Sequence, residues 1–149
     1  MTPEQNEPDP IGLGEMEWML SCRPNVLFKA ANEASDAALL HITEWISTPL
    51  HVCQLPGPAQ LPVRHSGALL LRDVDALDAQ QQAAVMDWLD LNAGNVQVIS
   101  ATATDLFAAV ERGTFSERLY YRLNTILAEF GVVNDQEAWV VGRREVHDR

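Results

Sequence analysis

The segment GALLLRDVDAL, residues 67–77, decides the fold. Its first five residues, Gly67 to Leu71, carry no polar side chain. An unbroken apolar run is typical of a central strand in a parallel sheet, because helices cover such a strand on both faces. The charged residues Arg72, Asp73 and Asp75 come directly after it, so we expect them at or just beyond the carboxyl end of this strand.

The segments after residue 77 alternate between helix and strand. Residues 78–91, DAQQQAAVMDWLDL, predict a helix capped by Asp78. Residues 96–102, VQVISAT, predict the next strand, and residues 105–113 predict a short helix that Gly113 ends. The segment 115–130, FSERLYYRLNTILAEF, leaves two interpretations open: it is mostly helical, or it is a helix followed by a short strand.

The segments before residue 67 show the same alternation. The sequence predicts a short helix at 11–21, a strand at 25–28, a helix capped by Asn32 or Ser35, a strand within 48–55, and a loop over the proline-rich residues 56–66. A last strand is expected within EAWVVGRREV, residues 137–146. This order predicts an α/β fold with a mainly parallel sheet and helices on both faces.

The length of 149 residues suits a single domain. Residues 1–10 are polar and rich in proline, and we expect them to be disordered or loosely held. Residues 11–149 then form the one domain. No apolar run is long enough to span a membrane and no signal-peptide pattern opens the chain, so a cytoplasmic protein is expected.

The charge of the chain and the spacing of its cysteines and histidines argue against two kinds of site. The formal net charge is −11, from 21 acidic and 10 basic residues, which argues against direct binding of nucleic acid. Lys29 is the single lysine. The two cysteines, Cys22 and Cys53, and the four histidines match no metal-ligand spacing, so we expect free thiols and no metal site.

Four segments in the second half resemble the central AAA+ domain of sigma-54-dependent transcription activators. They are GALLLRDV, DAQQQAAVMDWL, VQVISATATDL and GTFSERLYYRLNTI, and they occur in the order of that family. The run ERLYYRLN, residues 117–124, is the most specific of them. The resemblance is strong over 67–126 and implies a P-loop NTPase-like core, here truncated before the helical lid of the family.

The resemblance also implies where a nucleotide site would lie, and the residues there are degenerate. Asp36 stands where the family has the P-loop lysine, and the stretch around it contains no glycine. Arg72 and Asp73 replace the acidic pair that handles magnesium and water. Because a P-loop needs glycines and a lysine to hold phosphate, we expect no binding of ATP or magnesium as cofactors.

Two residues could be remnants of that site. Thr102 matches the family's sensor threonine, but Ala103 replaces the asparagine that follows it. Arg122 matches one of two arginines that the family presents to a neighbouring subunit, whereas Ser116 replaces the other. The family's loop that contacts sigma factor has no counterpart, because only residues 56–66 join the two strands there.

The same run supplies candidates for a contact with another protein. The interface candidates are Arg118, Tyr120, Tyr121 and Arg122, together with Trp88 on the preceding long helix. For Arg122, an ion pair with a carboxylate on its own surface is the favoured alternative. The tryptophans could equally be packing residues.

The residues leave three functions open. The first is a catalytically inactive AAA+-like regulatory module that acts through protein–protein contacts in sigma-54-linked transcription, on a related activator or on a second copy of itself. The alternative is a regulator of the same family that binds ATP weakly without efficient hydrolysis. The third, a metabolic enzyme on a generic α/β sheet, rests on fold class alone, which licenses no function.

Overall fold

The computed structural model describes residues 10–11, 23–42, 46, 48–55, 61–62, 66–92, 94–133 and 136–142. The expected helix at 11–21 and residues 1–9 lie outside these ranges, apart from Ile11. The described elements are β1 (Pro10–Ile11), β2 (Val26–Lys29), α2 (Asn32–Ile42), β3 (Leu50–Gln54), β4 (Gly67–Arg72), the 3-10 turn η2 (Val74–Ala76), α3 (Ala79–Leu91), β5 (Val96–Thr102), α4 (Leu106–Glu111), α5 (Glu117–Leu123), β6 (Ile126–Val133) and β7 (Gln136–Gly142).

The seven strands form one sheet in the order β1-β7-β6-β2-β5-β4-β3. Five neighbouring strands, from β6 to β3, are parallel to one another. The strand β7 runs antiparallel to β6, and β1 runs antiparallel to β7. The prediction of a mainly parallel sheet is confirmed, with an antiparallel edge.

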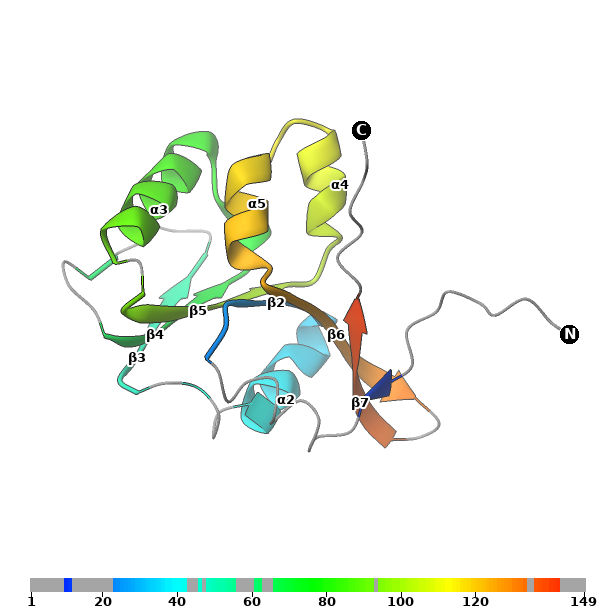
Figure 1. The fold of residues 1–149 in the computed structure, drawn as a ribbon. Coiled ribbons are helices and arrows are strands. Elements are labelled where there is room, and N and C mark those ends of the chain that lie inside the picture. Colours follow the sequence, from blue (N-terminus) through cyan, green and yellow to red (C-terminus); the bar gives the residue numbers. More distant parts are fainter. Residues whose placement is uncertain are drawn as a thin grey trace, which may run out of the picture.

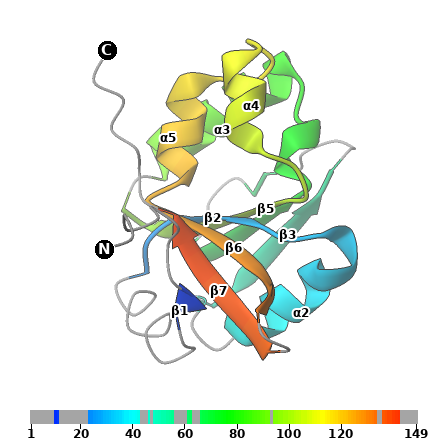
Figure 2. The same cartoon turned by 90° about the vertical axis from the view of Figure 1, so that its right-hand side faces the viewer.

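Helices cover both faces of the sheet, as predicted. Figures 1 and 2 show α2 on one face and α3, α4 and α5 on the other. Neighbouring residues of β2 separate the two layers: Leu27 belongs to the core under α3, α4 and α5, and Phe28 belongs to the core under α2. Both side chains are essentially fully buried. This alternation is what a central strand requires, because successive side chains point to opposite faces.

The helix α3 begins as its sequence predicts. The carboxylate of Asp78 accepts a hydrogen bond from the backbone N–H of Gln81, and the side chain of Gln81 accepts one from the backbone N–H of Asp78. This reciprocal pair satisfies two donors that would otherwise lack a partner at the helix start.

A buried glutamine ties α3 to the segment before α5. The Nε2 group of Gln82 donates to the carbonyl oxygens of Leu77 and Thr114, at 2.9 and 3.0 Å. Its Oε1 atom accepts from the backbone N–H of Ser116 at 2.7 Å. Because Gln82 is only 4% exposed, all three bonds lie within or at the border of the core.

Of the two interpretations of the segment 115–130, the structure shows the helix followed by a strand. The helix α5 ends at Leu123, and β6 begins three residues later at Ile126. The strand is eight residues long, so the expectation of a short strand was wrong. Its first half, Ile126 to Glu129, pairs with β2, and Leu127 to Val133 pair with β7, which explains why this apolar segment is extended.

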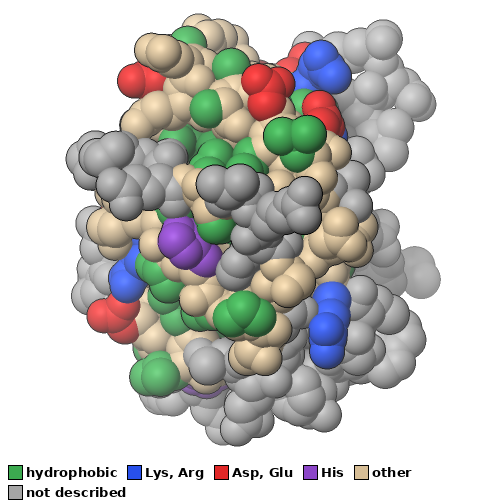
Figure 3. Space-filling model, turned by 90° about the vertical axis from the view of Figure 1, so that its left-hand side faces the viewer, with side chains coloured by type: hydrophobic (Ala, Val, Ile, Leu, Met, Phe, Trp, Pro, Cys, Tyr) green, Lys and Arg blue, Asp and Glu red, His purple; other side chains and the backbone are tan. Residues whose placement is uncertain are grey.

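The strand β3 forms the other edge of the sheet. It exposes Leu50 and Val52 at 40% and 49% of their surface. Figure 3 views the molecule from the side on which β3 lies in Figure 1, and the Lys and Arg side chains on this face are few and stand apart. Among the helices described, none is long and apolar enough to cross a bilayer.

Candidate functional site

The ends of three central strands bring the predicted site residues to one edge of the sheet. Lys29 ends β2, Thr102 ends β5, and these two residues pair across the strands. Arg72 ends β4 and pairs with Ala101 of β5. The chain leaves β2 toward one face, through α2, and leaves β5 toward the other, through α4 (Figure 1). Ligands of open α/β sheets bind at such a reversal.

The connection from β2 to α2 is short. Only Ala30 and Ala31 separate the strand from the helix, and the backbone N–H of Ala30 donates to the carbonyl of Thr102 at 3.0 Å. The helix begins at Asn32, so the residues up to Asp36 are already helical. A phosphate cradle needs an open loop whose N–H groups point at the ligand, and a helix commits these groups beyond its first turn.

The two residues with reversed charges contact each other. The Nη2 atom of Arg72 lies 2.7 Å from the Oδ1 atom of Asp36 in an ion pair that joins the end of β4 to α2. The side chain of Arg72 is 31% exposed and that of Asp36 is 80% exposed. Asp36 and Arg72, which the resemblance places at the family's lysine and acid positions, therefore attract each other.

Each of the acidic residues after β4 is engaged within the chain. Asp73 has a φ of 57°, a left-handed conformation that aspartate tolerates. Its carboxylate accepts a hydrogen bond from Nε2 of Gln54 at 2.7 Å. The carboxylate of Asp75 accepts from the hydroxyl of Thr102 at 2.8 Å, because η2 turns it back toward β5.

Sequence reasoning missed both of these contacts. Nothing in the sequence singles out Gln54, and Asp75 lies beyond the end of the strand, away from the family's acidic positions. A residue in a 3-10 turn after a strand can face the neighbouring strand. Recognising this turn after β4 would have suggested the contact of Asp75 with β5.

Among the predicted interface residues, three retain exposed surface on α5. Arg118 is exposed, and Tyr121 and Arg122 are half-buried. The Nη1 atom of Arg122 lies 2.6 Å from Oδ1 of Asp90 on α3, in a pair whose side chains are 38% and 58% exposed. Arg122 thus pairs with a carboxylate of its own surface, one of the two interpretations left open.

The remaining two interface candidates are packing residues, which corrects the expectation for them. Tyr120 is 5% exposed, and its ring lies 5.5 Å from that of Phe107. Burial raises the pKa of its hydroxyl above the ordinary value of 10.0. Trp88 is 6% exposed, and its indole N–H donates to the carbonyl of Pro62 at 2.6 Å. Neither side chain has enough exposed surface to form a contact with another protein.

The described residues contain no group of three or more His, Cys, Asp or Glu side chains arranged to hold a metal ion. Cys53 is buried in the core outside any disulfide, and burial raises the pKa of its thiol above 9.0.

Comparison with known proteins gives one family and one fold. A family model described as a sigma-54 interaction domain matches residues 30–129. No curated protein sequence matches the chain significantly. Crystal structures of NtrX from Brucella abortus share the fold: the complex with ATP has a TM-score of 0.65 at 18% identity, covering 78% of this chain and 35% of NtrX.

Two further NtrX structures agree with this result. The complex with ADP has a TM-score of 0.62 at 17% identity, covering 78% of this chain and 34% of NtrX. A third structure has a TM-score of 0.61 at 16% identity, covering 89% of this chain and 37% of NtrX. The chain therefore spans about a third of the NtrX chains that it resembles, and the likeness establishes the AAA+-type α/β fold.

Proposed function

Since this chain belongs to the sigma-54 interaction domain family, we propose that it is a regulatory module that acts through protein–protein contacts and neither binds nor hydrolyses ATP. The observation that carries the proposal is the start of α2. A helix stands there in place of a phosphate loop, and Asp36 pairs with Arg72.

The backbone matters more than the ion pair for the loss of ATP binding. An exposed ion pair contributes only about 0.2–1 kcal/mol, so breaking it would cost a ligand little. A phosphate cradle supplies several charge-assisted hydrogen bonds, each worth about 1.5–3 kcal/mol. With the helix starting at Asn32, only the N–H groups of its first turn could donate to a phosphate, because the loop that would supply the other donors is absent between β2 and α2. Arg72 in addition has no acceptor atom with which to hold magnesium.

The residues that could serve a weak nucleotide site already have partners. Asp73 accepts from Gln54, Thr102 donates to Asp75, and Arg122 pairs with Asp90. Rearranging three contacts for one ligand disfavours the alternative of a regulator that binds ATP without hydrolysis.

The surface of α5 is the best candidate for the protein contact. Arg118 and Tyr121 keep exposed surface there, beside the half-buried Arg122. Arginine and tyrosine are enriched where proteins bind one another. The partner we propose is the AAA+ domain of a related sigma-54-dependent activator or a second copy of this chain, in a cytoplasmic complex without nucleic acid or membrane.

Isothermal titration of the full chain with Mg-ATP tests the first part of the proposal. We expect no heat of binding up to millimolar nucleotide and no phosphate release. Micromolar binding with turnover would refute the proposal. Binding without turnover would favour the nucleotide-binding regulator instead.

Sedimentation of the chain, alone and with a related activator's ATPase domain, tests the second part. We expect a complex that Arg118→Glu weakens at least tenfold, about 1.4 kcal/mol, because a carboxylate then replaces an exposed cation in the contact. Arg112→Glu is the matched control, since Arg112 is an equally exposed arginine at the end of α4. A complex that both variants weaken alike, or no complex, counts against the α5 surface.

A further inference from the structure

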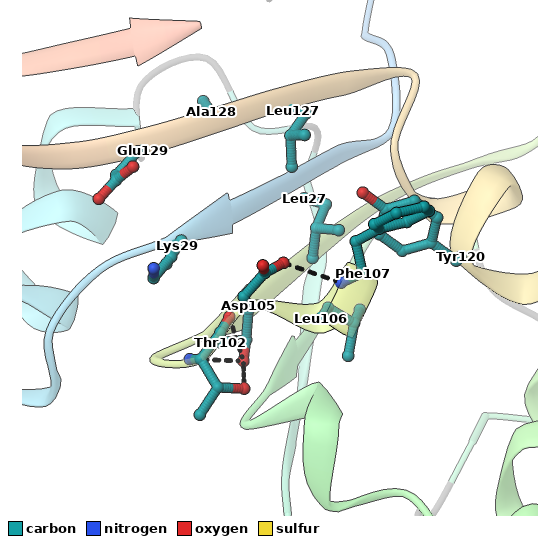
Figure 4. A pocket seen from close by; sticks show the side chains of 11 residues that line it. Leu27, Lys29, Thr102, Asp105, Leu106, Phe107, Tyr120, Leu127, Ala128 and Glu129 are labelled. Carbon is teal, nitrogen blue, oxygen red and sulfur yellow. Dashed lines mark hydrogen bonds between the residues drawn. The ribbon is translucent and has the colours of Figure 1, made fainter. Parts of the chain in front are cut away.

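A hollow of about 260 Å³ opens on the side of β2 that faces α4 and α5. Its floor comes from β2 and β6 and its wall from the segment after β5 and from α5 (Figure 4). Neither Arg72 nor Asp36 lines it. Lys29 and Thr102, which end β2 and β5, do line it, so the hollow borders the edge of the sheet where the family resemblance puts the nucleotide. The ligand inferred below is not a nucleotide, and its binding does not depend on the protein–protein contact proposed above.

The inner part of the hollow is apolar and aromatic. Leu27 and Leu127 form its floor, and Phe107 and Tyr120 stand over it (Figure 4). The two aromatic rings lie 5.5 Å apart and are tilted by 47°. Such a surface suits a flat ring, which packs against other rings in offset or edge-on arrangements.

The outer part carries both signs of charge. Lys29, the single lysine of the chain, lies on β2 at the register position of Glu129 on β6. Asp105 lines the opposite wall, where its Oδ1 atom accepts from the backbone N–H of Phe107 at 3.1 Å. In the part of the chain that the structure describes, Lys29, Asp105 and Glu129 form no ion pair with one another. Three charges in one hollow remain open to a ligand.

We infer that this hollow binds a small aromatic zwitterion, of the class of an aromatic α-amino acid. Its ring lies against Phe107 and Tyr120, its carboxylate binds Lys29, and its ammonium group binds Asp105 and Glu129. A purely anionic ligand would meet two carboxylates, and a purely cationic one would meet Lys29. The volume also limits the ligand to about one ring, because pockets for larger ligands measure about 300–1,000 Å³.

Calorimetric titration of the full chain with L-phenylalanine tests this inference. Two analogues each lack one charge: 3-phenylpropionate has no ammonium group, and 2-phenylethylamine has no carboxylate. L-alanine lacks the ring. We expect L-phenylalanine to bind and each of the three other compounds to bind about tenfold or more weakly, since each loses a charge-assisted contact or the buried ring.

Variants of two residues that line the hollow test whether L-phenylalanine binds there. We expect Lys29→Met and Glu129→Gln each to weaken L-phenylalanine about tenfold. Arg112→Met removes the same charge as Lys29→Met from an exposed position outside the hollow and is expected to change nothing. Circular dichroism checks that each variant is folded, and having two variants keeps the test decisive if one is not.

Three outcomes would each overturn the inference. They are the absence of L-phenylalanine binding to the wild type, equal binding of an analogue that lacks one charge, and unchanged binding by folded Lys29→Met and Glu129→Gln.

Discussion

The two layers of helices on this sheet each pack on an apolar core and differ in their polar contacts. On the face of α3, α4 and α5, the buried Gln82 makes three hydrogen bonds that fix the segment before α5 to α3. On the face of α2, an exposed ion pair between Arg72 and Asp36 joins the helix to the end of β4. The first layer contains the segments that resemble the AAA+ family most. The second occupies the position at which that family holds phosphate.

The difference separates contacts that are internal to the protein from residues at the position where the resemblance puts a phosphate. The contacts of Gln82 are internal to the protein and need no nucleotide to be useful. Under the proposed function no phosphate constrains the residues around Asp36, so their side chains can change without loss of a ligand.

The largest effect is expected at Gln82. The variant Gln82→Leu should lower the free energy of unfolding by about 3 kcal/mol, because it leaves the carbonyls of Leu77 and Thr114 and the N–H of Ser116 without partners. Urea unfolding followed by circular dichroism measures this loss. Gln80→Leu, at an exposed position of the same helix, should stay within about 0.5 kcal/mol of the wild type. Equal effects of the two variants would erase the contrast between the layers.

A smaller effect is expected at the start of α3. Asp78→Ala removes the carboxylate that caps the helix and should cost about 1 kcal/mol. Asp87→Ala, an exposed carboxylate in the middle of the same helix, is the control for the loss of charge. A cost for Asp78→Ala no greater than the control would mean that the capping contacts do not stabilise this layer.

The ion pair on the other face should contribute less still. A double-mutant cycle of Asp36→Ala and Arg72→Ala should give a coupling energy of about 0.5 kcal/mol, because both side chains keep contact with solvent. The coupling should shrink further at 1 M salt. A coupling above about 2 kcal/mol would show that the α2 layer depends on this pair as strongly as the other layer depends on Gln82.

The smallest effect concerns alkaline pH and Tyr120. Burial raises the pKa of Tyr120 above 10.0, and its hydrogen bond to Asn124 opposes the shift. The folded protein therefore binds this proton more tightly than the unfolded chain does, so stability falls as pH rises above 10.0. Tyr120→Phe should reduce the fall between pH 9.5 and 11 relative to the wild type, with Cys53 present in both. An undiminished fall would assign the effect to other groups.

The sequence predicted the layer of α3, α4 and α5 well, because its signals are local. The apolar run of β4 and the capping residue Asp78 each appear within a few residues of the element that they define. The resemblance of GALLLRDV and ERLYYRLN to one family supplied the fold, since both segments occur in its order.

The contacts at the candidate site were not predictable in the same way. An alignment can place Asp36 and Arg72 at two family positions, but their contact depends on the register in which α2 starts after β2. The burial of Tyr120 and Trp88 depends on the neighbouring residues Phe107 and Pro62, which come from other segments. Such pairs are set by the packed structure and leave no local pattern.

The antiparallel strand β7 changes where the chain leaves the sheet. The parallel strand β6 runs toward the edge that holds Lys29 and Arg72, and β7 brings the backbone back, so that Gly142 pairs with Leu127 near the start of β6. Gly142 is therefore level with Leu27, two residues before Lys29 along β2. A fluorophore placed at Gly142 would lie about 7 Å along the strand direction from the level of Lys29, given about 3.3 Å per residue.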